Sequence, residues 1–429
     1  MAVRVSTDQP QASGEEFNVA VAILQRDPIL GPLILDGSLA PYPPMPPVIE
    51  SAGADGQNER TVTVGLHPQR PKLTHEIVGV NLIRNQVVRY ATGAPPTAIA
   101  NSNICGIPSA GQGSPPRGTA GQYLITVTQG GTQIWQFLAT RPAASSGTRG
   151  SAIEVQFVDY MGKRVLKRGH VPILNVQYAG NLCGPYRDWQ WQESKLQADG
   201  TDVAPGVRSC PTPAQTILDD GTDVGNFWGF AYYTIGSELV LVTEMEAGWY
   251  RYVNEWRFDV NGTIRPRFRF GTTADSCVCN THTHHAYFRL DFDIVSSTKN
   301  LVSELDSRWF AIPRTVETKG FRTATQSRRW QVEYTGGREK YLILPRSDDG
   351  LTDTYGHGDL WILRYHDDEL DDHRDNTGGS NTDADLDQFV NGESIQNQDV
   401  VVWYGTHSTH QGGVEDADSV GPDLVPVNW

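Results

Sequence analysis

The chain has 429 residues, with 35 Lys and Arg against 50 Asp and Glu, and a formal net charge of −15. A chain of this length can bury a large core without metals or disulfides, and length alone suggests two or three domains. The acidic balance argues against a non-specific nucleic-acid binder, which needs positive charge to neutralise phosphates; it suits a soluble protein or one that attracts cationic ligands.

No run of about 18 apolar residues occurs, so we expect no membrane span. The first residues, MAVRVSTDQPQASGEEF, lack the charged start and apolar centre of a signal peptide, which favours a cytoplasmic location. The five cysteines do not make a disulfide framework, although Cys183 and Cys210 could pair.

The first predicted element is a short amphipathic helix over Gly14–Gln25, with acidic residues in its first turn. Strand patterns follow over Arg60–Leu66 and Glu76–Tyr90. A helix followed by a few strands predicts a small α+β domain over residues 1–92. Residues 93–122 are rich in Gly, Pro, Ser and Ala, which indicates a linker or a long surface loop.

From residue 123 to residue 429, short strand-like runs alternate with turn signals, and long helices are not indicated. The runs are Tyr123–Thr128, Ile153–Val158, Leu239–Val242, Tyr250–Val260, Ile264–Phe270, Ala286–Ile294, Trp330–Val332, Tyr341–Leu344, Leu360–Tyr365 and Val400–Tyr404. This pattern predicts a large antiparallel β-sandwich domain over residues 123–429. The fold as a whole is therefore expected to be mainly β.

Two histidine-rich segments carry a possible metal-ligand pattern. His282 and His284 lie two apart in a strand-like run, so both side chains would point to one face, about 7 Å apart, while His285 would face the other way. In the second segment, either His407 or His410 could complete a three-histidine site. Three neutral imidazoles favour copper or zinc. Unrelated surface and core histidines are the alternative interpretation.

These segments resemble the catalytic domain of copper amine oxidases. That family has an HxH pair, then four residues, then Arg-Leu-Asp; here His282 and His284 are followed at that spacing by Arg-Leu-Asp at 289–291. The family's third copper histidine lies seven residues after a tryptophan that ends an apolar strand, and counting from Trp403 selects His410 over His407. The resemblance implies a copper site formed by His282, His284 and His410.

The family also carries a peripheral calcium or manganese site. It is built from an Asp-x-Asp pair and an aspartate eleven residues before the third copper histidine, and Asp291, Asp293 and Asp399 occupy those positions. All-oxygen ligation suits a hard cation. The resemblance therefore implies a second metal site at these three carboxylates.

The family makes its own cofactor, topaquinone, from a tyrosine in an Asn-Tyr-Asp/Glu context. Alignment of Leu239–Trp256 places Tyr250 at that position, with Trp249 in place of the asparagine and Arg251 in place of the acid. On a strand, both neighbours would point away from Tyr250. Tyr178 resembles the family tyrosine that hydrogen-bonds the quinone.

The catalytic base that the resemblance implies has two candidates. The family uses an aspartate shortly after the quinone-binding tyrosine; alignment on Trp189 places the base near Glu193 or Ser194, and Asp188 is the other candidate. No Gly-rich turn follows either, although the family has one there. Both residues could also be ordinary surface carboxylates.

The activity that the resemblance implies is oxidation of a primary amine by oxygen to an aldehyde, with hydrogen peroxide and ammonia. Glu193 or Asp188 would remove a proton from the substrate, with a pKa raised by burial. The departures at Trp249 and Arg251 leave two alternatives open: a copper enzyme that acts on another substrate without topaquinone, and a catalytically silent family member. The family is usually a homodimer, so a dimer is implied as well.

Overall fold

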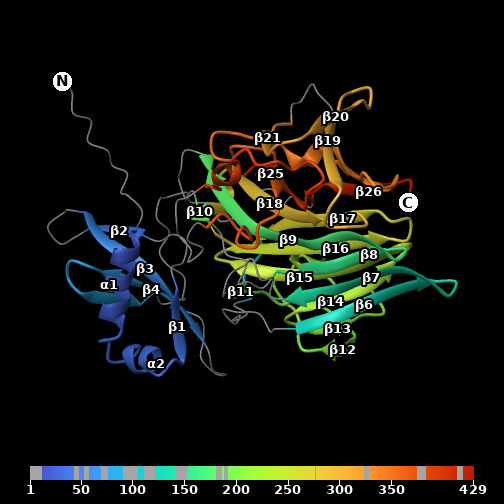
Figure 1. Ribbon diagram of the computed structural model, residues 1–429. Coiled ribbons are helices and arrows are strands. Elements are labelled where there is room, and N and C mark those ends of the chain that lie inside the picture. The colour runs from blue at the N-terminus through green and yellow to red at the C-terminus, as the bar shows by residue number, and fades with distance from the viewer. Residues whose placement is uncertain are drawn as a thin grey trace, which may run out of the picture.

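A computed structural model describes residues 12–42, 48–52, 58–68, 76–89, 105–110, 121–141, 152–179, 186–187, 192–275, 277–322, 328–373, 383–412 and 419–429. Over these residues the chain is mainly β, as predicted, with one small sheet and two large ones (Figure 1). No helix among them is both long and apolar enough to cross a membrane.

The small sheet lies near the N-terminus and carries two helices. Helix α1 (Gly14–Leu24) begins with a capping box, in which Ser13 Oγ accepts from the Glu16 amide and the Glu16 carboxylate accepts from the Ser13 amide. Buried residues of α1 and of the sheet share a hydrophobic cluster. The other elements here are α2 (Gly31–Leu35), β1 (Leu39–Tyr42), β2 (Val48–Ala52), β3 (Asn58–Pro68), β4 (Glu76–Asn81) and β5 (Gln86–Arg89).

The first large sheet runs in the order β21-β24-β25-β18-β9-β8-β7-β6, with β10 paired to β9. Its strands are β6 (Gly121–Gln129), β7 (Thr132–Arg141), β8 (Glu154–Tyr160), β9 (Lys163–Tyr178), β10 (Tyr186–Arg187), β18 (His282–Phe292), β21 (Thr318–Gly320), β24 (Leu360–Arg364) and β25 (Val400–His410). The predicted runs at 286–294 and 400–404 are thus the centre of this sheet, and all its pairings are antiparallel.

The second large sheet runs in the order β12-β13-β14-β15-β16-β17-β26-β23-β22-β19-β20, with β11 paired to β15. Its strands are β11 (Gln192–Glu193), β12 (Thr201–Ala204), β13 (Val207–Ser209), β14 (Phe230–Ile235), β15 (Glu238–Ala247), β16 (Tyr250–Asp259), β17 (Ile264–Thr272), β19 (Asn300–Leu305), β20 (Ala311–Arg314), β22 (Arg329–Tyr334), β23 (Lys340–Leu344) and β26 (Asp423–Val427). The short helix α3 (Ile217–Asp220) packs near β17.

The two large sheets face one another across a single hydrophobic core. Phe137 of one sheet stacks on Phe258 of the other with 4.1 Å between ring centres. At Gly169 on β9, a Cβ would lie 2.6 Å from the ring of Trp256, so only glycine permits this close approach. This sandwich brings side chains of β18 and β16, which lie far apart in sequence, into the same interior.

Strand β9 was not predicted, because basic residues, Gly169 and Pro172 interrupt its apolar alternation. Part of the segment predicted as a linker pairs with the chain just beyond β17: Cys105 and Ile107 form isolated β-bridges with Asp275 and Thr273. The boundaries of the domains at residues 92 and 123 stay a prediction.

Candidate metal centre

Three of the predicted ligands converge inside the sandwich. His282 on β18 pairs directly with His410 on β25, and His284 lies two residues further along the same face of β18. The ring centres are 5.0 Å apart for His282 and His284, 5.4 Å for His282 and His410, and 5.2 Å for His284 and His410. A metal–nitrogen bond of about 2 Å would place each ring centre roughly 3 Å from a shared ion, so these separations fit three ligands of one metal.

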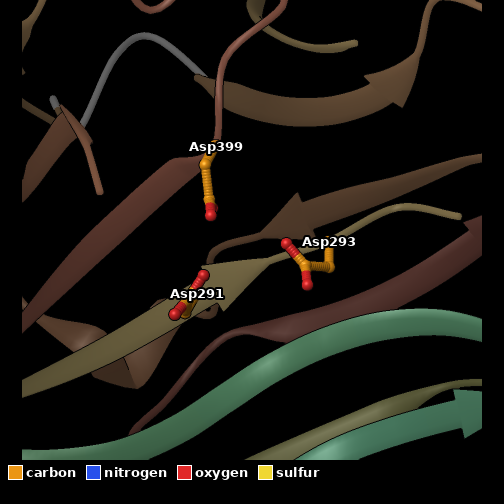
Figure 2. Close-up of side chains that lie close together, drawn as sticks. All are labelled: Asp291, Asp293 and Asp399. Carbon is orange, nitrogen blue, oxygen red and sulfur yellow. The ribbon is translucent and has the colours of Figure 1, made fainter. Parts of the chain in front are cut away.

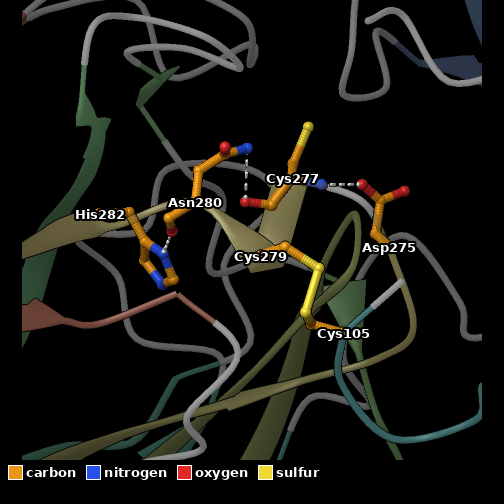
Figure 3. Close-up of a disulfide and its surroundings, with 6 residues drawn as sticks. All are labelled: Cys105, Asp275, Cys277, Cys279, Asn280 and His282. Carbon is orange, nitrogen blue, oxygen red and sulfur yellow. Dashed lines mark hydrogen bonds between the residues drawn. A yellow bond between two sulfur atoms is a disulfide. The ribbon is translucent and has the colours of Figure 1, made fainter. Parts of the chain in front are cut away.

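The protonation of these imidazoles also suits a metal. His282 Nδ1 lies 2.8 Å from the carbonyl oxygen of Asn280, which can only accept, so Nδ1 carries the proton and Nε2 the lone pair (Figure 3). Nε2 of both His282 and His284 is buried and has no hydrogen-bond partner among the described residues. Burial lowers the pKa of His282 and brings that of His284 well below its ordinary value, which keeps both rings neutral. Neutral imidazole is the form that binds copper.

Tyr250 enters this site from the opposite sheet. It is the first residue of β16 and fully buried, and its ring centre lies 5.7 Å from that of His282 and 4.7 Å from that of His284. Its hydroxyl is hydrogen-bonded to the hydroxyl of Tyr178, the last residue of β9. The structure therefore places Tyr178 and Tyr250 beside the histidines, as the resemblance implied.

The two neighbours of Tyr250 behave differently from one another. Arg251 points away from the Tyr250 ring, as predicted, and pairs with Asp223. Trp249 does not point away: its Nε1 donates to the Tyr178 hydroxyl at 2.9 Å. The prediction for Trp249 was wrong because Gly248 and Trp249 form the turn between β15 and β16, where strand alternation does not apply.

The predicted bases cannot be placed as side chains. Asp188 lies outside the described residues, and Glu193 is described only as backbone, where it pairs with Met245 of β15. Their roles stay predictions. Ser194, which the alignment left near the base position, is buried and donates to Glu244 Oε1 at 2.6 Å.

The three aspartates of the predicted peripheral site also come together. Asp291 and Asp293 lie at the end of β18, and Asp399 directly precedes β25, so the pairing of these strands gathers their carboxylates (Figure 2). They offer oxygens that all lie within 4.8 Å of one another. Burial, reinforced by the neighbouring carboxylates, raises the pKa of Asp291 to about 8 and that of Asp293 to about 6. A hard cation suits such a set of oxygens.

A disulfide joins Cys105 to Cys279, three residues before His282 (Figure 3). Cys210 is a free, buried thiol, so the pairing of Cys183 with Cys210 does not form. Cys277 is disulfide-bonded as well. These bonds were not predicted, because connectivity is not encoded by local spacing. Disulfides persist in oxidising compartments, so this bond, unlike the N-terminal residues, favours such a compartment.

Sequence reasoning also missed Glu244, a fully buried carboxylate on β15. It lies on the face of the sheet opposite Tyr250, and its oxygens accept from Ser194 Oγ at 2.6 Å and from the Ile217 amide at 2.8 Å. Burial raises its pKa to about 7. Nothing in the local sequence distinguishes it from Glu246, two residues on.

Replacing Glu244 by Gln should flatten the pH dependence of stability. Because the pKa of Glu244 is raised in the folded state, its carboxyl group contributes its full stabilisation of the fold below about pH 4.5. That contribution is lost as the pH rises through about 7. Gln resembles the protonated acid, so E244Q should lose less stability than the parent between pH 5 and 8, by an amount on the order of 3 kcal/mol. Urea unfolding at several pH values measures it. E246Q is the control, and an equal flattening in both variants would contradict the assignment.

Known proteins support the relationship suggested by the sequence. Residues 336–428 match the model of the copper amine oxidase enzyme domain. A primary amine oxidase of Klebsiella aerogenes is 23% identical over 354 residues, covering 59% of this chain and 46% of that protein, so the chain spans about half the length of this relative.

Two solved structures share the fold across nearly the whole chain. A copper-containing benzylamine oxidase from Hansenula polymorpha gives a TM-score of 0.50 at 14% identity, covering 98% of this chain and 83% of its own. A lysyl oxidase from Pichia pastoris gives a TM-score of 0.53 at 12% identity, covering 97% of this chain and 74% of its own. The chain therefore resembles the copper amine oxidases in the sequence of residues 336–428 and in its fold.

Proposed function

We propose that this protein is a copper-dependent oxidase of primary amines. His282, His284 and His410 would hold the copper, and Tyr250 would be the precursor of topaquinone. The observation that carries this proposal is the placement of the Tyr250 ring beside His282 and His284, with ring centres 5.7 and 4.7 Å apart. The relatives named above are themselves amine oxidases, which supports the same reaction class.

Copper and a quinone made from Tyr250 would supply the electron-accepting chemistry, so that amine, oxygen and water give aldehyde, ammonia and hydrogen peroxide. The surrounding residues would hold the metal ligands and Tyr250 in position and would enclose the site. The Asn280 carbonyl fixes the tautomer of His282, and the Tyr178 hydroxyl holds the oxygen of Tyr250. Burial of all these rings excludes water from the site.

Three further parts of the proposal come from the resemblance. Glu193 or Asp188 would be the base that takes the substrate proton. The substrate would be a small cationic amine, in keeping with the net charge of −15. The protein would act as a homodimer.

A second candidate is a copper enzyme that works with an unmodified Tyr250. The observation that favours it is the hydrogen-bonded chain from Trp249 through Tyr178 to Tyr250. Trp249 stands where the family has asparagine, and it completes a network that holds the intact phenol beside the histidines. Such a site would oxidise another class of substrate.

Copper loading in air should decide between the two candidates. If the proposal is right, the copper-loaded protein gains mass at Tyr250, located by peptide mass spectrometry, and forms a coloured adduct with phenylhydrazine. Y250F should bind copper and show neither change. Bound copper with an unmodified Tyr250 would reject the quinone and support the second candidate, which peroxide release from a panel of amines and phenols would then test.

Replacing His410 should abolish tight copper binding, whereas replacing His407 should not. His407 lies on the same strand and is equally buried, but it faces away from the site and contacts His285. Loss of a ligand in H410A should weaken copper binding by more than the roughly 10- to 100-fold typical of an outer-shell change. Copper titration of H410A and H407A gives the comparison. The ligand set is wrong if H407A loses copper and H410A retains it.

We also propose that Asp291, Asp293 and Asp399 bind calcium. Calcium at about 100 times its Kd should add about 2.7 kcal/mol to the free energy of unfolding, seen as a rise in Tm. Protons compete for the same oxygens, so the rise should be larger at pH 8 than at pH 5. In the D293N/D399N variant the rise should vanish. A calcium-dependent rise that survives in this variant would place the cation elsewhere.

A further inference from the structure

The turn before Tyr250 joins β15 to β16, and its Trp249 carbonyl oxygen accepts hydrogen bonds from the amide and the hydroxyl of Thr273. Gly248 has a φ of 60°, and with Trp249 it reverses the chain between β15 and β16. Tyr250 pairs with Ala247 on one side and Thr272 on the other. The histidines come from the opposite sheet, so a small shift of this turn would move the Tyr250 ring relative to the metal ligands.

The guanidinium of Arg251 grips this turn from the face opposite the Tyr250 ring. Its Nη1 donates to the carbonyl oxygens of Gly248 at 3.2 Å and of Tyr250 at 3.0 Å. Its Nε and Nη2 donate to the two carboxylate oxygens of Asp223 at 2.8 and 3.1 Å. Both side chains are buried, so solvent does not loosen this bidentate pair.

Asp223 connects the same grip to a second segment. Its Oδ2 also accepts from the Ala110 amide at 2.9 Å and from Ser109 Oγ at 3.2 Å. Residues 105–110 are in turn fixed by the disulfide of Cys105 with Cys279, which leads into the strand of His282. The Asp223 carboxylate therefore links the Tyr250 turn, through Arg251, to residues 105–110, which the disulfide anchors beside the proposed copper ligands.

We propose that Arg251 and Asp223 are positioning residues that hold Tyr250 at its working distance from the metal. This inference rests on the proposed function, in which Tyr250 is the reacting residue. It also gives a physical role to Arg251, where the family has an acid: the charge is reversed, but the side chain serves the backbone of the turn rather than the site itself. We call Arg251 and Asp223 together the clamp. The clamp should govern how fast Tyr250 is modified and leave copper binding unchanged.

The test compares Arg251 with Arg267, a matched buried arginine on the neighbouring strand. Arg267 donates to the carbonyls of Pro266, Gly421 and Pro422 and pairs with Asp423, away from the Tyr250 turn. R251K and R251Q should bind one copper per chain yet modify Tyr250 about 10- to 100-fold more slowly, because a displacement of about 1 Å costs a rate of this order. R267K and R267Q should modify Tyr250 at the parental rate.

Two outcomes overturn the inference: Tyr250 modification at the parental rate in the copper-loaded Arg251 variants, or equal slowing in the Arg267 variants. D223N should slow the modification as R251Q does, and the double variant should be no slower than either single one. If R251Q does not fold, R251K and D223N decide by the same criteria.

Failure of the proposed function has a different signature. If the parental protein never modifies Tyr250, the quinone proposal fails, and the clamp is judged by hydrogen exchange in the metal-free protein. The amides of residues 249–252 should then exchange at least about tenfold faster in R251K than in R267K. Equal exchange in the two variants would refute the clamp independently of any chemistry.

Discussion

The register between β18 and β25 is the constraint on which both proposed metal sites depend. At one end of the paired strands, His282 lies opposite His410. At the other end, Asp291 and Asp293 lie close to Asp399. Because side chains alternate along a strand, a slip of one residue would send both histidines of β18 to the outer face. The same slip would separate the three aspartates from one another. One set of backbone hydrogen bonds therefore specifies both candidate sites.

On the opposite face of β18 and β25, the same register places His285 and His407 together, away from the candidate copper site. His285 and His407 pair there with Nδ1 atoms 2.8 Å apart, and Gly356 packs so tightly on them that a Cβ would lie within 2.5 Å of both rings. His407 Nε2 lies 3.0 Å from the carbonyl oxygen of Gly358. Both ring nitrogens of His407 are therefore hydrogen-bonded, whereas Nε2 of His282, of His284 and also of His285 has no hydrogen-bond partner among the described residues. His407 is thus a core histidine, and what sets His285 apart from His282 and His284 is the face of β18 on which it lies.

Much of this arrangement could be predicted from the sequence, because it follows from local spacing. The i, i+2 pair of His282 and His284, and the count from Trp403 to His410, depend only on strand alternation and on resemblance to a family. Where a turn interrupts a strand, alternation fails, and Trp249 accordingly points into the site instead of away from it. The disulfide of Cys105 with Cys279 and the buried Glu244 depend on contacts between distant segments, which no local pattern reports.

Diffraction from a copper-soaked crystal, measured at the copper absorption edge, would show which histidines bind the metal. We expect one strong anomalous peak per chain between the rings of His282, His284 and His410, with the ring of residue 250 alongside. A peak at the His285–His407 pair instead, or copper bound by His282 and His284 with His410 turned away, would contradict it.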